Sequence, residues 1–319
     1  MMIEGRWVTD NQIPADKNGR FDRPSTAFRN WITPDGAPGP GGARGFRAQP
    51  GRYHLYVSLA CPWAHRTMIM RRLKGLEDAI GLSVVHWHMG DQGWTFEPGP
   101  GVIPDPVVHA AALHDIYRAS APDYSGRVTV PVLWDRETAQ IVNNESADIL
   151  RMFGSAFDEC GARAGDYYPA ALRGEIDAVN ARVYETVNNG VYKAGFARRQ
   201  EAYDEAVLAL FESLDWLDER LSSRRWLCGD NMTEADIRLF TTLVRFDIVY
   251  VGHFKCNIRR IADYAHLSRL LGDMLAIPEI RDAVDAHHIK HHYYGSHPGI
   301  NPSGIVPAGP LTPIAPVGA

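Results

Sequence analysis

The first half of the chain alternates between strand-like and helix-like segments, whereas the second half shows helical spacing alone. Residues 53–58 are β-prone and precede a Cys-Pro turn, and residues 82–88 form a second apolar segment of strand length. Between them, a helix is predicted from Pro62 to about Lys74, with proline well placed at its first position and Gly75 just past its end. This strand–helix–strand order predicts a parallel crossover unit.

The alternation continues beyond residue 100. A short helix is predicted at residues 107–117. Residues 129–135 and 140–142 then predict a β-hairpin, and a further helix begins near Glu145–Ser146. The resulting order, β-α-β-α-β-β-α, is that of a thioredoxin-like domain.

Segments of the second half place apolar residues at helical intervals. Ala206, Leu210 and Leu214, for example, fall on one helix face. Thr233 and Asp236 precede another apolar run in the arrangement of a helix-capping box. The helical segments are 171–189, 200–222, 234–249, 261–276 and 278–285. The predicted fold class is therefore α/β followed by an all-α domain.

The two ends of the chain lack this periodicity. Residues 1–50 are rich in Gly, Pro, Asn and Asp, and they predict an irregular N-terminal extension. Residues 291–319 are rich in Gly and Pro and predict an irregular C-terminal arm. The domains between them are a thioredoxin-like domain at 51–155 and an all-helical domain at 171–290.

Composition narrows the function classes. The chain has 319 residues, 45% of them hydrophobic, and a formal net charge of -5. No run of Lys and Arg suggests a nucleic-acid partner, and the apolar runs fall short of a membrane span. The N-terminus does not have the pattern of a signal peptide. We therefore expect a cytoplasmic enzyme that binds neither nucleic acid nor membrane.

The cysteine pattern excludes two common kinds of site. The four cysteines include no CxxC pair and no zinc-knuckle spacing. A disulfide scaffold is not expected in a chain this long with so few cysteines. Three of them are interpreted as buried packing thiols: Cys160, Cys228 and Cys256.

Cys61 is the candidate reactive residue. It directly precedes the helix predicted at Pro62, where the unpaired N–H groups and the helix dipole favour a thiolate. His65 and Arg66, one turn further on, could add positive charge. Because Ala64 occupies the place of a second cysteine, a redox cycle requires an external thiol. The alternative is that Cys61 is a packing thiol like the others.

Two further features point to glutathione as that thiol. Val130-Pro131 precedes a strand, and a cis bond there would turn the Val130 backbone groups toward an extended, peptide-like ligand. Glu145 and Ser146 at a helix N-terminus can bind an ammonium group and a carboxylate, both of which the γ-glutamyl end of glutathione carries. An acidic helix cap is the structural alternative for this pair.

The chain resembles the glutathionyl-hydroquinone reductases, the Xi class of the glutathione transferase superfamily. The matching stretches are residues 60–67, 93–96, 124–135, 143–146, 189–197, 249–257 and parts of 294–307. They span nearly the whole chain. The first stretch is shared with Omega-type transferases, and the later ones separate the two classes. The 97–123 connection has no familiar counterpart.

The resemblance implies a glutathione transferase fold and a reaction in two steps. The Cys61 thiolate would attack the sulfur of a glutathionyl-hydroquinone and release hydroquinone. A second glutathione would resolve the resulting Cys61–glutathione disulfide to oxidised glutathione. The implied glutathione contacts are Trp94, Arg127, Val130, Glu145 and Ser146, and the implied aromatic-substrate contacts are Tyr192, Tyr250 and Tyr294. Glutathione is the co-substrate, no metal is expected, and a homodimer is implied by analogy alone.

Other interpretations stay open on the residues alone. The same Cys61 would serve an Omega-like thioltransferase or dehydroascorbate reductase, and a transferase-like fold could also be a binding module without activity. Each tyrosine could simply pack in the core. Four clustered histidines are interpreted as an exposed helix end and not as a metal site: His287, His288, His291 and His292.

Overall fold

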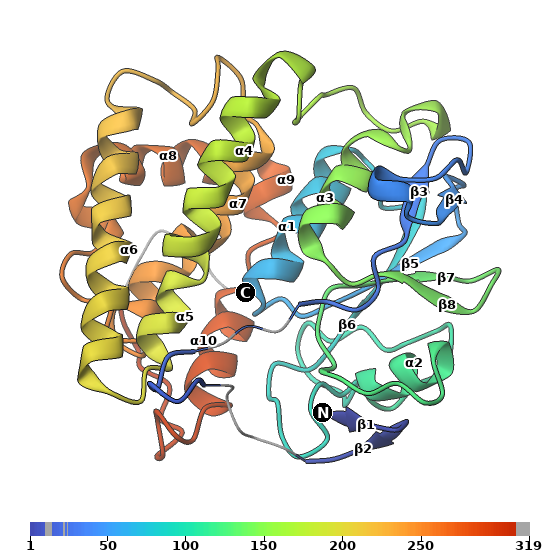
Figure 1. Cartoon of the computed structure of the whole chain (residues 1–319), viewed down its shortest axis with the longest axis horizontal. Helices are drawn as coiled ribbons and strands as arrows, with labels where there is room; N and C mark the ends of the chain where they lie inside the picture. Colours follow the sequence, from blue (N-terminus) through green and yellow to red (C-terminus); the bar gives the residue numbers. More distant parts are fainter. Residues whose placement is uncertain (10–14, 22, 24, 311–319) are drawn as a thin grey trace. The chain divides into compact units, whose positions relative to one another are not determined.

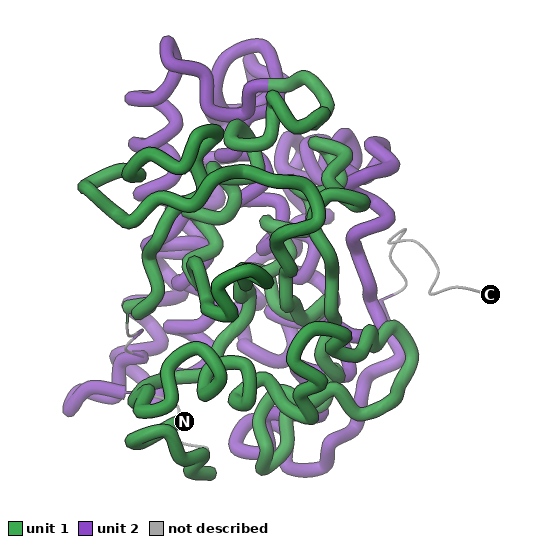
Figure 2. Tube along the Cα trace, turned by 90° about the vertical axis from the view of Figure 1, so that its right-hand side faces the viewer, with its two compact units in different colours: residues 1–11, 25–165 green, residues 12–24, 166–319 purple. Residues whose placement is uncertain are grey.

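The computed structural model describes residues 1–9, 15–21, 23 and 25–310. The chain divides into two compact units, Met1–Asn11 with Ser25–Gly165 and Gln12–Pro24 with Asp166–Ala319 (Figure 2). We call them unit 1 and unit 2. Parts of the predicted N-terminal extension (10–14, 22 and 24) and of the predicted C-terminal arm (311–319) lie outside the described residues.

Unit 1 contains a four-stranded sheet of order β6-β5-β7-β8 (Figure 1). β5 pairs in parallel with β6 and antiparallel with β7, and β7 pairs antiparallel with β8, so the predicted crossover and hairpin are confirmed. All five residues of β5 are buried because the strand is central in the sheet. The strands are β5 (Tyr53–Val57), β6 (Ile80–Val84), β7 (Val132–Asp135) and β8 (Gln140–Asn143).

Three α-helices accompany this sheet, and α1 packs beside α3. α1 begins at Pro62 with a proline in its first turn, as predicted, and ends one residue before the predicted Lys74. The helices are α1 (Pro62–Leu73), α2 (Leu113–Ser120) and α3 (Ser146–Ser155), with 3-10 turns at Pro40–Gly42 and Asp158–Cys160.

Two predicted boundaries in unit 1 are wrong. β6 ends at Val84, not at residue 88, because the following chain turns to bond a loop: the His86 N–H donates to the Thr95 carbonyl at 2.8 Å. The helix predicted from residue 107 begins only at Leu113. The Asp105 carboxylate accepts hydrogen bonds from the backbone N–H groups of residues 107, 108 and 110, and this holds the segment in a turn.

The N-terminal extension is more regular than predicted. β1 (Met2–Ile3) and β2 (Arg6–Trp7) form an antiparallel hairpin, and β3 (Trp31–Thr33) and β4 (Gly45–Arg47) form a parallel pair. Composition misled the prediction because strands of two or three residues carry no detectable period, and their partners lie far away in sequence.

The secondary structure of unit 2 consists of helices and one isolated bridge, Ala15 with Phe21, among its described residues. Two of the predicted helices change from α to π geometry before they end, at residues 183–188 and 246–250. The elements are α4 (Arg173–Arg182), α5 (Gly190–Gly195), α6 (Gln200–Leu221), α7 (Glu234–Arg245), α8 (Ala265–Leu275), α9 (Pro278–Arg281) and α10 (Ala286–Gly295), the π-helices Val183–Asn188 and Phe246–Tyr250, and 3-10 turns at Ala170–Leu172 and Ile261–Asp263. Within the part of the chain that the structure describes, no helix is long and apolar enough to cross a membrane.

α7 starts with the predicted capping box, in which the Asp236 carboxylate accepts from the Thr233 backbone N–H at 2.8 Å. α10 continues to Gly295, so the irregular arm begins later than residue 291. The four clustered histidines are on this helix, and the prediction that they are exposed is wrong. His288 and His292 are buried, because at helical spacing they share the inward face with Ile289 and Tyr293, and the other two are half-buried.

Candidate active site

Cys61 is the N-cap residue of α1 and is half-buried. Its backbone carbonyl accepts from the His65 N–H at 3.0 Å, the first bond of the helix, and its Sγ lies 3.8 Å from the Val130 carbonyl oxygen. The Val130-Pro131 bond is cis, as predicted. Val130, which is distant in sequence, therefore lies beside the thiol. The thiol itself is at the positive end of the α1 helix dipole, which favours a thiolate.

Arg66, one of the two residues predicted to add positive charge near Cys61, is a buried side chain. Arg66 is only 2% exposed, and its Nη1 lies 3.4 Å from the Ser146 hydroxyl oxygen. Its guanidinium also lies 4.5 Å from the ring centroid of Trp63, a cation–π contact. Arg66 thus connects the start of α1 with the start of α3. His65 is completely buried.

Glu145 is the N-cap residue of α3, and Ser146 is the first residue of that helix. The Glu145 Oε1 accepts from the Ala147 N–H at 3.2 Å, and its Oε2 accepts from the Thr26 hydroxyl at 3.2 Å. The structural alternative, an acidic helix cap, is therefore realised. A carboxylate oxygen has two lone pairs, so these bonds leave capacity for a ligand ammonium group.

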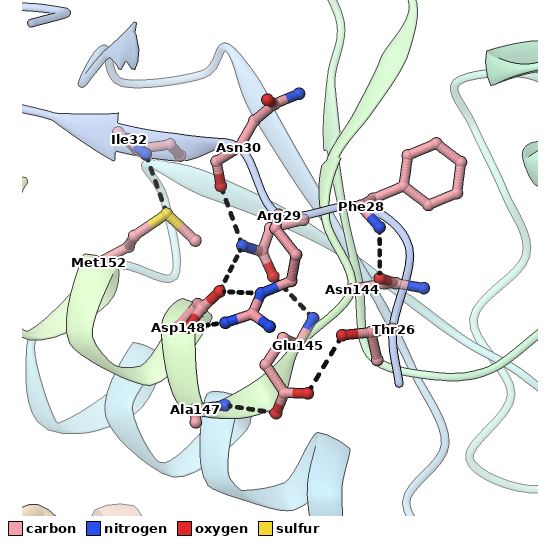
Figure 3. A network of polar contacts seen from close by, with 11 residues as sticks. Thr26, Phe28, Arg29, Asn30, Ile32, Asn144, Glu145, Ala147, Asp148 and Met152 are labelled. Carbon is pink, nitrogen blue, oxygen red and sulfur yellow. Dashed lines mark hydrogen bonds and ion pairs between the residues drawn. The ribbon is translucent and has the colours of Figure 1, made fainter. Parts of the chain in front are cut away.

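The chain from Thr26 to Ile32 holds this helix start in place, as Figure 3 shows. Arg29 forms two hydrogen bonds with the Asp148 carboxylate, at 2.6 and 3.0 Å. The Phe28 N–H donates to the Asn144 side chain at 3.1 Å. Thr26 and Arg29 were not predicted as functional residues, because the composition of their segment indicates irregular structure. The polar run at 143–146, which ends a buried strand, was the available signal.

Asn143 ties the same junction together. Its Oδ1 accepts from the Glu145 N–H at 2.6 Å, and its Nδ2 donates to the Asn30 carbonyl at 2.9 Å and to Asp148 Oδ2 at 3.0 Å. Every hydrogen-bonding group of this amide is used inside unit 1. The backbone at Glu145 is fixed by a side chain two residues before it, so the orientation of the α3 start is built into the β8–α3 connection.

The other two predicted glutathione contacts are on loops of unit 1. Trp94 is 6% exposed, and its carbonyl accepts from the Leu113 N–H at 2.8 Å. Arg127 is exposed, and its carbonyl accepts from the Tyr124 hydroxyl at 2.9 Å. Both backbones are anchored, and the roles of the two side chains stay predictions.

Unit 2 contains a cluster of tyrosine hydroxyls. The Tyr293 hydroxyl lies 2.5 Å from that of Tyr192 and 3.1 Å from that of Tyr250. Tyr294, the residue implied by the resemblance, lies apart from this cluster: its hydroxyl donates to the Ile248 carbonyl at 3.4 Å. Adjacent residues of a helix point about 100° apart, so only one of the pair 293–294 reaches the cluster.

Burial keeps two tyrosines of the cluster protonated over a wider pH range than usual. It raises the pKa of Tyr250 and of Tyr293 well above the ordinary value of 10.0. These hydroxyls stay protonated at neutral pH and can donate hydrogen bonds. Tyr250 ends the π-helix Phe246–Tyr250, and Tyr192 is in α5, directly after the other π-helix. Short π segments are frequent at functional sites.

A cation lies next to the cluster within unit 2. The Arg23 guanidinium is 5.1 Å from the Tyr192 ring centroid, and its Nε donates to the Asn189 side chain at 2.7 Å. Phe21 also stacks against Tyr192, with ring centroids 6.3 Å apart. These contacts were not predictable from the sequence, because they bring residues together across more than 160 positions.

Histidines of unit 2 extend the aromatic cluster. The His253 Nε2 lies 3.1 Å from the His297 Nδ1, and the His253 ring is 4.9 Å from that of Tyr294. Burial lowers the pKa of His253 to about 4 and that of His297 well below 6.5. Across the described residues, no three or more His, Cys, Asp or Glu side chains are grouped so that they could hold a metal ion.

Comparison with known proteins adds independent information. The profile "Glutathione S-transferase, N-terminal domain" matches residues 60–156, and "Glutathione S-transferase, C-terminal domain" matches residues 200–272. The chain is 54% identical over 314 residues to the glutathionyl-hydroquinone reductase PcpF of Sphingobium chlorophenolicum, covering 98% of this chain and 97% of the relative. It is 56% identical over 310 residues to the glutathionyl-hydroquinone reductase YqjG of Escherichia coli, covering 97% and 94%.

Solved structures agree with these matches. The glutathione-bound structure of YqjG has a TM-score of 0.91 at 53% identity, covering 99% of this chain and 97% of the other. The glutathione S-transferase Xi of Phanerochaete chrysosporium has a TM-score of 0.89 at 51% identity, covering 96% and 97%. The likeness extends over both units and is not confined to the segments around Cys61.

Proposed function

The chain belongs to the glutathionyl-hydroquinone reductases, the Xi class of the glutathione transferase superfamily, and we propose that it reduces glutathionyl-hydroquinones to hydroquinones with glutathione as co-substrate. The predicted fold, a thioredoxin-like half followed by a helical half, is confirmed by the two family profiles and the structural matches. The observation that carries the proposal is Cys61 at the N-cap of α1, 3.8 Å from the Val130 carbonyl, with alanine in place of a second cysteine.

The reaction begins with Cys61. Its thiolate attacks the sulfur of the thioether, the bond between that sulfur and the aromatic carbon breaks, and the carbon takes up a proton. The products are free hydroquinone and a Cys61–glutathione disulfide. A second glutathione attacks this disulfide as thiolate, which gives oxidised glutathione and returns Cys61 as thiolate. Two glutathione sulfurs end as one disulfide, so the oxidation balances the reduction of the carbon–sulfur bond.

We assign the glutathione contacts to residues of unit 1. Glu145 binds the γ-glutamyl ammonium by charge, and Ser146 with the N–H groups of α3 binds the carboxylate. Buried Arg66 beside the Ser146 hydroxyl supports anion binding at this helix start. The Val130 backbone pairs with the cysteinyl part of glutathione, next to Cys61. Trp94 and Arg127 complete the proposed contacts.

We assign the aromatic part of the substrate to the tyrosines of unit 2. The resemblance implies Tyr192, Tyr250 and Tyr294, and the hydrogen bonds of Tyr293 support adding it to the set. A protonated phenol hydroxyl can donate to the phenolic oxygen of the leaving hydroquinone and stabilise developing negative charge there. The buried, protonated state of Tyr250 and Tyr293 supports this role.

We propose a cytoplasmic location from the chemistry of the reaction and a homodimer from the family. The reaction consumes reduced glutathione, which fits a cytoplasmic enzyme because that compartment keeps glutathione reduced. A homodimer is proposed by analogy and is tested by light scattering coupled to size-exclusion chromatography.

Mass spectrometry of single-turnover mixtures tests the proposal. The protein is mixed with a glutathionyl-hydroquinone without free glutathione, and we expect one glutathione adduct on Cys61 and one equivalent of hydroquinone. A folded protein that acquires no adduct would refute the mechanism. Turnover of dehydroascorbate but not of the conjugate would instead favour the Omega-like activity.

A further inference from the structure

The N-terminal hairpin, residues 1–8, is built onto a distant loop of unit 1. The Met2 N–H donates to the Gly126 carbonyl at 2.8 Å, and the Gly126 N–H donates back to the Met2 carbonyl at 2.9 Å. The Gly5 N–H donates to the Tyr124 carbonyl at 3.0 Å. Met2 is completely buried. The hairpin therefore adds strand pairing to residues 124–126, which directly precede Arg127.

Trp7, at the end of the hairpin, contacts a second loop. Its Nε1 donates to the Asp91 carbonyl at 2.8 Å, and its ring stacks on His114 with centroids 4.8 Å apart. A Cβ atom built at Gly93 would stand 2.9 Å from the Trp7 ring, so the ring lies directly against the Gly93 backbone. Gly93, at φ +67, directly precedes Trp94.

One hairpin thus holds the backbone next to both loop residues assigned to glutathione. We propose that the N-terminal hairpin positions Trp94 and Arg127 for glutathione, with Trp7 as the positioning residue. The inference rests on the proposed function, since it takes these two side chains as glutathione contacts. Trp7 itself does not touch the reacting atoms in this assignment.

The loops need such support for a physical reason. Between the end of β6 and the start of α2, residues 85–112 contain neither helix nor strand, and isolated bridges and single backbone hydrogen bonds pair them with other backbone. A ligand contact on such a loop contributes more affinity when the loop is held in its bound geometry beforehand, because less ordering is needed on binding. Indole stacking on His114 and packing on Gly93 supply that restraint at the residue before Trp94.

The test compares three variants in the full-length protein. Trp7→Ala removes the ring, Trp7→Phe keeps an aromatic ring but loses the Nε1 donor, and Val8→Ala alters the neighbouring exposed position as a matched control. Glutathione affinity is measured by calorimetry, KM for glutathione and kcat by turnover, and Cys61 alkylation by iodoacetamide, which needs no glutathione site. Thermal unfolding monitors folding.

We expect Trp7→Ala to raise the Kd and the KM for glutathione about tenfold, with kcat changed less and Cys61 alkylation unchanged. Trp7→Phe is expected to raise the Kd about threefold, between Trp7→Ala and the wild type, and Val8→Ala to match the wild type. A folded Trp7→Ala variant that binds glutathione within twofold of wild type overturns the inference. An equal loss of glutathione affinity and of the Cys61 alkylation rate also overturns the inference, because it would show that the substitution disturbs the whole of unit 1.

Two possible outcomes distinguish a failure of this inference from a failure of the proposed function. If wild-type protein neither binds glutathione nor turns over the conjugate, the proposed function fails first, whatever the variants do. If Trp7→Ala does not fold, Trp7→Phe decides: loss of the Asp91 bond is expected to raise the Kd about threefold, and an unchanged Kd overturns the inference.

Discussion

The surroundings of Cys61 in unit 1 and the tyrosine cluster in unit 2 are built from different kinds of polar group. Around Cys61 the recurring groups are helix starts, backbone carbonyls and charged caps: Cys61 begins α1, Glu145 begins α3, and Arg29 is paired with Asp148. In the cluster they are neutral hydroxyls among rings, with Tyr293 between Tyr192 and Tyr250. The first arrangement is suited to binding a charged group, and the second is suited to donating hydrogen bonds without bearing charge.

The contrast predicts how each region tolerates substitution. A helix start offers several backbone N–H groups at once, so losing one side chain that orients it should weaken binding in part. The cluster depends on hydroxyl-to-hydroxyl bonds around the buried Tyr250 and Tyr293, where the loss of a donor costs more than it does at an exposed site. Substitutions in the two regions should therefore differ in size and in the kinetic constant they change.

The largest effect is expected for Cys61→Ser. Turnover of a glutathionyl-hydroquinone should fall at least about a thousandfold, because serine is a far weaker nucleophile at neutral pH and cannot form the disulfide. Glutathione affinity, measured by calorimetry, should stay within about threefold, since the helix starts and the Val130 backbone remain. Cys160→Ser, at the other half-buried thiol of unit 1, is the matched control and should keep full activity. Comparable losses in both variants would contradict the assignment.

Tyr293→Phe is expected to come next. Removing the hydroxyl that joins Tyr192 and Tyr250 should lower kcat about 30-fold, with KM for glutathione unchanged, because the effect belongs to the phenolic leaving group. Tyr294→Phe is the adjacent comparison and should lower kcat less than about threefold, since its hydroxyl donates to a backbone carbonyl instead. Steady-state kinetics decide, and the reverse order of the two variants would show that Tyr294 contributes more to the release of hydroquinone than Tyr293.

The pair 293–294 also shows where sequence reasoning stops. The Cys-Pro turn, the cis Val130-Pro131 bond and the Glu145–Ser146 cap were predictable because each depends on neighbouring residues and on local rules of helix starts and proline geometry. The choice between Tyr293 and Tyr294 depends on the rotation of α10 relative to α5. That rotation is a tertiary property, and no short sequence window records it.

The prediction of an irregular N-terminal extension was incomplete for a related reason. Gly- and Pro-rich composition correctly predicted few long elements, but it could not reveal that Met2 pairs with Gly126 or that Thr26 reaches Glu145. Those contacts span more than a hundred positions and involve strands too short to have a period. The change from α to π geometry that ends at Tyr250 could not be predicted from the sequence either, since both geometries accept the same apolar pattern.

Acid should destabilise the aromatic surroundings of the tyrosine cluster. Burial holds the pKa of His253 at about 4 and that of His297 well below 6.5, so both are neutral when folded and titrate near 6.5 when unfolded. The stability they contribute is complete above pH 6.5 and is lost as pH falls toward 4. The contribution of His253 alone to the free energy of unfolding, measured in urea, should fall by about 2 kcal/mol between pH 7 and pH 5, and His297 adds to this fall.

Substitution distinguishes these histidines from others in the chain. His297→Asn should flatten the fall of unfolding free energy with pH, because the variant no longer has that buried base to protonate. Buried His54 of unit 1, whose pKa is also lowered to about 4, contributes to the slope that remains. The exposed His88 is the control, and His88→Asn should leave the slope as it was. Equal slopes in all three proteins would contradict the role given to His297.

The smallest effect is expected for Thr26→Val, which removes the hydroxyl that donates to Glu145 Oε2 at 3.2 Å. Glu145 keeps its bond to the Ala147 N–H and its charge, so the Kd for glutathione should rise only about threefold to fivefold, with kcat unchanged. Thr33→Val is the matched control, because that hydroxyl bonds the nearby Ala37 carbonyl at 2.9 Å. A hundredfold rise of the Kd for glutathione would show that the orientation of Glu145 matters as much as its charge. The start of α3 would then be as sensitive to the loss of one hydroxyl as the tyrosine cluster is. No rise would leave the cap of α3 sufficient by itself to orient the carboxylate.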